Sequence, residues 1–131
     1  MGAVADAHDV GNYLKTLGVP DDHIRYLINA DATRVAIIQA LKALRHDTRV
    51  KRDRDCILIF YAGHGGEKDA PQGWASRGSK VQMILPVDYR TTLGNGTVQG
   101  IPDRTISRLL DDLAEKVNNI VREHSHMCRV R

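Results

Sequence analysis

An unbroken apolar run, Cys56–Tyr61, is the feature that most constrains how this chain can fold. The run is too short for an ordinary helix and is rich in β-branched and aromatic residues. We therefore predict a strand that is buried on both faces, and such strands belong to parallel sheets. The run leads into glycines that surround His64, so we expect a flexible glycine turn at the carboxyl end of the strand. Open α/β sheets bind their ligands at that end, so the sequence predicts an α/β fold with a site at this turn.

The imidazole of His64 favours acid/base chemistry at the predicted turn. Its reference pKa of about 6.5 allows it to take a proton from a thiol or a hydroxyl near neutral pH. The glycines on both sides leave room for a substrate backbone to approach. A structural role is the alternative, in which the ring hydrogen-bonds a neighbouring carbonyl in the turn. The residues alone leave both interpretations open.

Length and charge exclude several classes of protein. The 131 residues make one domain at most, and 42% hydrophobic residues with mixed charges indicate a globular chain. The net charge is only +3, because 16 acidic residues largely offset 19 basic ones, so we expect no nucleic acid partner. The sequence has no run of roughly 18 apolar residues and no signal peptide pattern, so we expect no membrane partner.

The two cysteines, Cys56 and Cys128, do not make a disulfide framework. We therefore expect a reducing, cytoplasmic compartment.

Three segments have the apolar periodicity of amphipathic helices. The first starts almost at the beginning of the sequence and stops at Gly18. In the second, Thr33 is the predicted N-cap of a helix through about Arg45. Pro102 and Asp103 open the third. The apolar stripe of the third helix is Ile106, Leu109, Leu110, Leu113 and Val117.

Two further segments, Ile24–Ile28 and Val81–Leu85, are strand candidates. The charged connector Arg45–Asp55 could be a polyanion patch, but its interleaved aspartates favour a solvated loop. Glu67–Lys80 is predicted to be a surface loop beside the site. It contains Trp74, which could contact a substrate or cover the core.

Three stretches resemble the caspase-like cysteine peptidases, closest to the metacaspases and their fungal relatives. They are FYAGHG at 60–65, ILPVD at 84–88 and QGIPDRTISRLLDDLAE at 99–115. The resemblance implies a caspase-like three-layer α/β sandwich with a mostly parallel sheet. It also implies that His64 is the acid/base half of a Cys/His dyad, and that Gly63, Gly65 and Gly66 lie near the substrate and the oxyanion. The substrates of this family are peptides or proteins.

Other properties follow from the resemblance only. Calcium is possible on this ground, and we otherwise predict no cofactor. Metacaspases are expected to cleave after basic residues and caspases after Asp, and the sequence does not choose between them. Asp88 and Asp103 match acidic positions of the family, although a capping or turn role explains both.

The sequence departs from the family at both ends. In the family an apolar strand precedes the first helix, and a second strand after Val121 leads to an Asp, any residue, Cys, His, Ser, Gly motif. Residues 122–131 are too charged for a buried strand. We therefore predict a fold that is incomplete at both ends, with a partial caspase-like domain at 1–121 and a divergent basic tail at 122–131. We expect the chain to be inactive by itself.

Cys128 is the candidate nucleophile, because Cys56 is predicted to point into the core as a small hydrophobe. His124, His126 and Cys128 alternate along the tail as zinc ligands could. A structural zinc site usually needs four ligands, and no matching pair is nearby, so we predict no metal site.

Two alternatives to a peptidase remain. The chain could be a catalytically dead regulatory or interaction relative that pairs with another caspase-like chain through an exposed sheet edge. It could also be a polyanion-binding module built from Arg45–Arg54 and Arg122–Arg131. The second alternative predicts salt-sensitive binding that survives His64→Ala.

Overall fold

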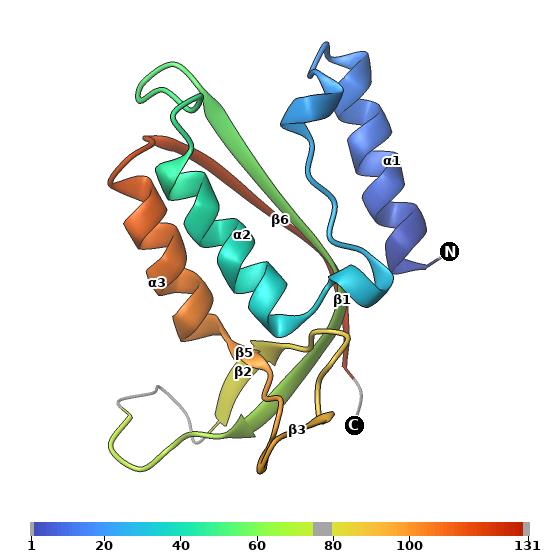
Figure 1. The fold of residues 1–131 in the computed structure, drawn as a ribbon, viewed down its shortest axis with the longest axis vertical. Helices are drawn as coiled ribbons and strands as arrows, with labels where there is room; N and C mark the ends of the chain where they lie inside the picture. The colour runs from blue at the N-terminus through green and yellow to red at the C-terminus, as the bar shows by residue number, and fades with distance from the viewer. Residues whose placement is uncertain (1, 75–79, 130–131) are drawn as a thin grey trace.

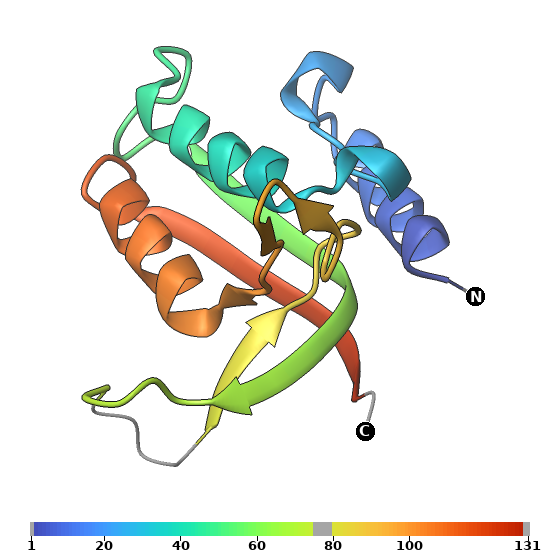
Figure 2. The same ribbon diagram turned by 60° about the horizontal axis from the view of Figure 1, so that its bottom comes forward.

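The computed structural model describes residues 2–74 and 80–129, which form a sheet and a layer of helices (Figure 1). The sheet has the strand order β5-β2-β1-β6. Its strands are β1 (Cys56–Asp69), β2 (Lys80–Ile84), β5 (Ile101–Pro102) and β6 (Asn119–Arg129). The pairing of β1 with β6 is parallel, whereas β2 is antiparallel to both β1 and β5. Figures 1 and 2 show β1 and β6 side by side. A small separate hairpin joins β3 (Thr92–Leu93) to β4 (Gly96–Thr97).

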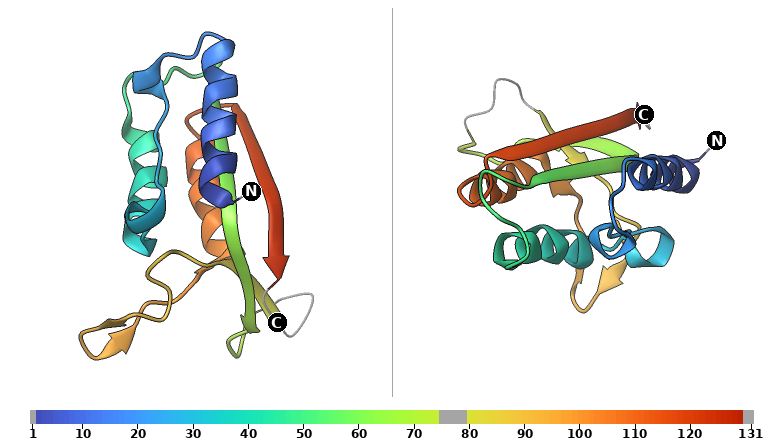
Figure 3. Two further views of the ribbon diagram at one scale, coloured as in Figure 1. Left: turned by 90° about the vertical axis from the view of Figure 1, so that its right-hand side faces the viewer. Right: turned by 90° about the horizontal axis from the view of Figure 1, so that it is seen from above.

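The helices are placed asymmetrically about the sheet. They are α1 (Ala3–Thr16), α2 (Arg34–His46) and α3 (Asp103–Ala114). Both α2 and α3 lie on one face of the sheet (Figure 3). α1 lies beside the first part of β1, along the edge opposite β6. Among the described residues, no helix covers the opposite face. The predicted α/β class is therefore confirmed, and the described residues form two of the three layers that the resemblance implies.

All three predicted helices are present, and local signals set their ends. The hydroxyl of Thr33 accepts a hydrogen bond of 3.2 Å from the Ala36 N–H, which is the expected N-cap of α2. Gly18 follows α1 with a φ of 86°, a left-handed conformation that glycine adopts without strain. The Lys116 ammonium donates to the carbonyls of Leu44 and Asp47, so it caps the carboxyl end of α2.

The hydrophobic core lies between α2, α3 and the first part of β1. Its buried members are Leu41, Ile57, Leu110, Leu113 and Val117. Partly buried side chains surround them, namely Ile37, Leu44, Val50, Ile59, Ile106, Leu109 and Ile120. The predicted stripe of α3 is therefore the face that packs into this core.

The apolar run does form a strand, but three expectations about this region were wrong. The strand is not buried on both faces, because Cys56 is exposed and Leu58 is 38% exposed. Ile57 and Ile59 alternate with them and face the helices. The expectation that Cys56 enters the core therefore fails, since the helices of the described residues cover only one face of the strand. The strand also continues to Asp69, so it takes up the start of the predicted loop at Glu67–Lys80.

The predicted strand at Ile24–Ile28 is absent. The segment runs between two short 3₁₀ turns, Asp21–His23 and Asn29–Asp31, and pairs with no strand. Its ends, Ile24 and Ile28, are nevertheless extended, with φ values of −107° and −127°. Local sequence favours an extended backbone here, but a strand also needs a neighbour with which to exchange hydrogen bonds.

The tail is the largest departure from the sequence prediction. A strand was not expected after Val121, yet β6 crosses that position and runs to Arg129. β6 is an outer strand of the sheet in the described part of the chain. Outer strands often carry charged residues, so the charged sequence that argued against a buried strand is compatible with this position.

The charged connector is a solvated loop, as the aspartates suggested. Arg49 pairs with Asp47 at 2.8 Å, and the arginines at 52 and 54 each lie within 4.0 Å of the aspartate that follows them. These ion pairs are exposed and neutralise much of the local charge. The described helices include none that is long and apolar enough to span a membrane.

Candidate active site

His64 lies where the neighbours of β1 change. Upstream of it, Cys56–Ala62 pairs in parallel with β6, and downstream of it, Gly65–Asp69 pairs antiparallel with β2. We call residues 62–65 the seam of β1. Gly65 pairs with both neighbouring strands, so the expected glycine turn was wrong and the motif is part of the strand. The imidazole of His64 is on the exposed surface at this seam.

Two hydrogen bonds hold the backbone carbonyl of His64. The N–H of Leu85, just after β2, donates to it at 2.9 Å. The phenol hydroxyl of Tyr61 donates to the same oxygen at 2.8 Å. Both lone pairs of the carbonyl are therefore used. Neither contact leaves a signal in the sequence pattern, so the sequence predicts no functional role for Tyr61 or Leu85.

The phenol of Tyr61 is half-buried. Burial raises the pKa of Tyr61, and a backbone hydrogen bond involving Leu85 partly opposes the rise. The phenol is therefore protonated at neutral pH, which keeps the hydroxyl available as a donor to the His64 carbonyl.

The glycines of the motif allow close packing rather than a flexible turn. A Cβ at Gly63 would lie 2.6 Å from the Tyr61 hydroxyl oxygen, so no larger residue fits there without movement. A Cβ at Gly66 would lie 3.2 Å from a methyl carbon of Leu85, which is also tight. These glycines leave room for the phenol of Tyr61 and for the side chain of Leu85, just after β2.

The backbone register brings Cys128 next to His64. Ala62 pairs with Ser125, and two residues later His64 pairs with Cys128, so β6 contains one more residue than β1 across this step. In an unbroken ladder His64 would instead face Met127. Such irregularities often re-aim residues next to active sites.

The acidic positions Asp88 and Asp103 have structural roles. A carboxylate oxygen of Asp88 accepts a hydrogen bond of 2.9 Å from the N–H of Arg34, the first residue of α2. Asp103 opens α3 and accepts from the N–H of Arg104 at 2.6 Å. Asp88 therefore satisfies an N–H at the start of α2, and Asp103 is an acidic residue in the first turn of α3, whose N-cap is Pro102.

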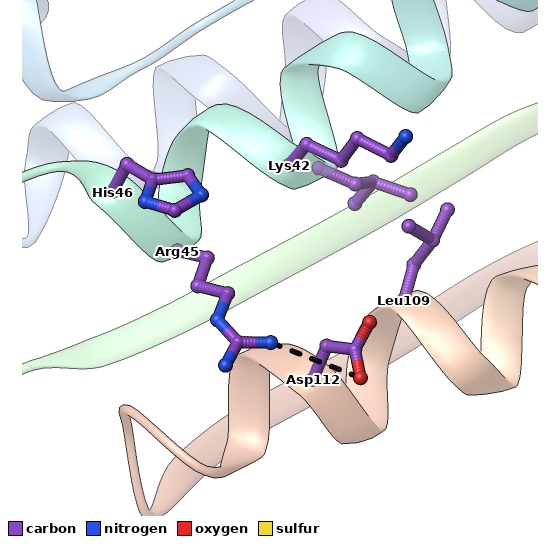
Figure 4. A pocket seen from close by; sticks show the side chains of 6 residues that line it. Lys42, Arg45, His46, Leu109 and Asp112 are labelled. Atoms are coloured by element: carbon purple, nitrogen blue, oxygen red, sulfur yellow. Dashed lines mark ion pairs between the residues drawn. The ribbon is translucent and has the colours of Figure 1, made fainter.

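A surface pocket lies between α2 and α3, away from the seam, and Figure 4 shows its side chains. Across it, Arg45 of α2 faces Asp112 of α3 at 3.8 Å and also pairs with Glu115 at 3.0 Å. Its lining residues are Leu41, Lys42, Arg45, His46, Leu109 and Asp112. His64 is not among them, so this pocket is not part of the histidine site.

Metal ligands do not gather in the part of the chain whose side chains the structure describes. No group of three or more His, Cys, Asp or Glu residues there could hold an ion. The zinc hypothesis for His124, His126 and Cys128 concerns side chains outside that part.

Comparison with known proteins identifies the family. The family profile for the caspase domain matches residues 1–125. Metacaspase-1 of Mycosarcoma maydis is 32% identical over 92 residues, which are 68% of this chain and 23% of that protein. Metacaspase-1 of Saccharomyces cerevisiae (strain YJM789) is 30% identical over 97 residues, which are 69% of this chain and 22% of that protein. The chain thus spans less than a quarter of the length of these curated relatives.

The mixed α/β fold fits that of a caspase domain. The chain belongs to the caspase-domain family. The resemblance read from the sequence is therefore confirmed.

Proposed function

We propose that this chain is part of a cysteine endopeptidase domain in which His64 is the acid/base group and Cys128 is the nucleophile. The observation that carries the proposal is the parallel register of His64 with Cys128 on adjacent strands. Neighbouring strands lie roughly 4.8 Å apart, which is a separation that a thiol and an imidazole can bridge. The membership of the caspase-domain family supports the same reaction.

The proposed reaction is acyl transfer through a thioester. The imidazole takes the thiol proton, and the thiolate attacks the carbonyl carbon of a peptide bond. The imidazolium then gives its proton to the leaving amine, which breaks the peptide bond. Water, deprotonated by the same imidazole, hydrolyses the thioester and returns the thiol. Backbone N–H groups near Gly63, Gly65 and Gly66 would stabilise the oxyanion.

We further propose that this chain has no peptidase turnover by itself, although His64 and Cys128 are paired in the backbone register. The family motif has an Asp two residues before the cysteine and His, Ser, Gly after it. Here His126 precedes Cys128, and Arg, Val, Arg follow it at 129–131. Residues 122–131 therefore depart from the family where it completes the site around the thiol.

The pairing of His64 with Cys128 is tested by the pH dependence of thiol alkylation. The experiment uses a Cys56→Ser variant, so that the reaction with iodoacetamide measures alkylation of Cys128 alone. A thiol beside an imidazolium ionises below its usual pKa of about 8.5, so we expect alkylation to continue below pH 7. His64→Ala should reduce the rate at pH 6 by about tenfold or more, because the thiolate then forms only at higher pH.

The matched control is His46→Ala, which removes an exposed histidine on α2 that lines the separate pocket. It should leave the alkylation profile unchanged. Circular dichroism should show that each variant is folded. Identical profiles with and without His64 would refute the dyad.

A second assay tests turnover with peptides that end in Arg, Lys or Asp, with and without calcium. We expect no cleavage by the 131-residue chain. Cleavage that disappears in both His64→Ala and Cys128→Ala would show that the chain is an active enzyme.

An interaction relative without catalysis is the second candidate, and the position of β6 favours it. β6 is the outer strand at its side of the described sheet, so one edge of it is available for pairing with another caspase-like chain. This function predicts binding to a complete metacaspase that is kept in His64→Ala.

A further inference from the structure

Tyr61 lies across the motif rather than within the apolar core. Tyr61 and Gly63 are two residues apart on β1 and therefore lie on the same side of the strand. A Cβ at Gly63 would be 2.6 Å from the phenol oxygen and 2.9 Å from the ring carbon that bears it. The phenol thus occupies the space above Gly63. From there its hydroxyl reaches the carbonyl of His64 at 2.8 Å.

The contact fixes β1 at its most irregular point. The pairing of β1 with β6 changes register between Ala62 and His64, so Gly63 has no partner in the parallel ladder. A backbone that lacks ladder partners needs other hydrogen bonds to hold one conformation. The bonds from Tyr61 and from the Leu85 N–H go to the carbonyl of the next residue, His64, so they hold the backbone directly beside the irregularity.

We propose that Tyr61 is a positioning residue, whose hydroxyl holds the backbone of His64 in the register that pairs His64 with Cys128. The proposal rests on the dyad put forward above for its catalytic meaning. The hydroxyl of Tyr61 bonds the backbone carbonyl of His64 and not its imidazole. It acts through the His64 carbonyl, and Gly63 is needed because the phenol occupies the place of a side chain.

The test is Tyr61→Phe in the Cys56→Ser chain, which keeps the ring and removes only the donor. We expect alkylation of Cys128 at pH 6 to slow by about three- to tenfold, in proportion to the loss of one hydrogen bond. The profile should move toward that of His64→Ala. A tyrosine with a purely structural role would lower the unfolding midpoint without moving this profile.

Tyr13→Phe is the matched control, because Tyr13 is a 63% exposed residue of α1. It should change neither the profile nor the seam. A Tyr61→Phe profile that coincides with the parent profile, in a chain where His64→Ala does move it, would overturn the proposal while the dyad stands.

A second measurement separates failure of the proposal from failure of the dyad. NMR reports the carbonyl carbon of His64 and the mobility of its imidazole without any need for catalysis. We expect Tyr61→Phe to shift the carbonyl resonance and to increase the motion of the ring. If His64→Ala leaves alkylation unchanged, the dyad fails, and unchanged NMR signals in Tyr61→Phe would then refute the positioning role as well.

Discussion

The two halves of β1 differ in almost every respect, although they belong to one strand. Cys56–Ala62 pairs in parallel with β6 and packs Ile57 against the helices. Gly65–Asp69 pairs antiparallel with β2, and its last three residues are exposed. The first half packs against α2 and α3, whereas the second half runs out to the surface beside β2, which buries Val81 and Met83. His64 lies between the two halves.

This contrast explains why the candidate site is at the seam. The first half is held by buried apolar contacts, so its position is fixed by the helices above it. The second half is fixed by β2 and by the segment after it, through the hydrogen bond from Leu85 to the His64 carbonyl. A residue at the junction is therefore oriented by both, while its side chain stays exposed to a ligand.

The largest expected loss of stability distinguishes the two faces of the first half of β1. Ile57 is 7% exposed and belongs to the core, whereas the adjacent Leu58 is 38% exposed. Ile57→Ala should lower the free energy of unfolding by about 2–4 kcal/mol, because it leaves a cavity under α2 and α3. Leu58→Ala should cost less than about 1 kcal/mol. Urea unfolding followed by circular dichroism measures both, and equal losses would contradict a one-sided core.

The sequence was sufficient for the helices because their signals are local. An apolar stripe, the N-cap Thr33 and the stop at Gly18 each act within a few residues, and the structure confirms them. The strand predictions were wrong where the formation of a strand depends on a neighbouring strand. Ile24–Ile28 has the composition of a strand but no neighbour, and β6 has an unfavourable composition but pairs with β1.

The candidate site was found only in part for the same reason. The glycine-rich motif located His64, because its residue types are distinctive. The neighbour of His64 depends on the register between strands that are far apart in the sequence, and that register changes at the seam. The contact from Tyr61 depends on the same irregularity. Neither leaves a periodic pattern that sequence analysis can detect.

A smaller effect is expected from closing the space above Gly63. In Gly63→Ala the new methyl group would lie 2.6 Å from the Tyr61 hydroxyl, so the phenol must move. We expect a loss of about 1–3 kcal/mol in unfolding free energy and slower alkylation of Cys128 at pH 6. Gly96→Ala is the control, since a Cβ there has no atom within 4 Å.

A double-mutant cycle shows whether the phenol is the obstacle. In a Tyr61→Ala chain the ring is absent, so adding Gly63→Ala should cost much less than in the parent. Coupling below about 0.5 kcal/mol between the two positions would mean that Gly63 is needed for another reason.

We expect the unfolding free energy to fall by about 1 kcal/mol when a hydrogen bond between the segment after β2 and the start of α2 is removed. The segment after β2 is joined to the start of α2 by the bond between the Asp88 carboxylate and the Arg34 N–H, and by a bond from the Val87 N–H to the Ala32 carbonyl. Asp88→Ala removes the first bond and should destabilise by that amount, as the loss of a helix cap does. The alkylation profile of Cys128 should not change. If Asp88→Ala changed the alkylation profile of Cys128 without lowering the unfolding free energy, Asp88 would have a role in the histidine site.

The smallest effect concerns the loop that leads into the first half. The side chain of Arg49, and then its backbone N–H, lower the pKa of Asp47 from 3.8 to about 2. Because the folded pKa is below the unfolded one, this pair stabilises the fold above about pH 3.8, and the contribution is lost as the pH falls toward 2. Carboxyl carbon NMR should show the low pKa in the parent and a rise in Arg49→Gln, with Arg52→Gln as the control. Arg49 is exposed, so Arg49→Gln should lower the unfolding midpoint at neutral pH only slightly, in contrast to Ile57→Ala. A large loss of stability at neutral pH would mean that charge pairs, as well as apolar burial, hold the first half in place.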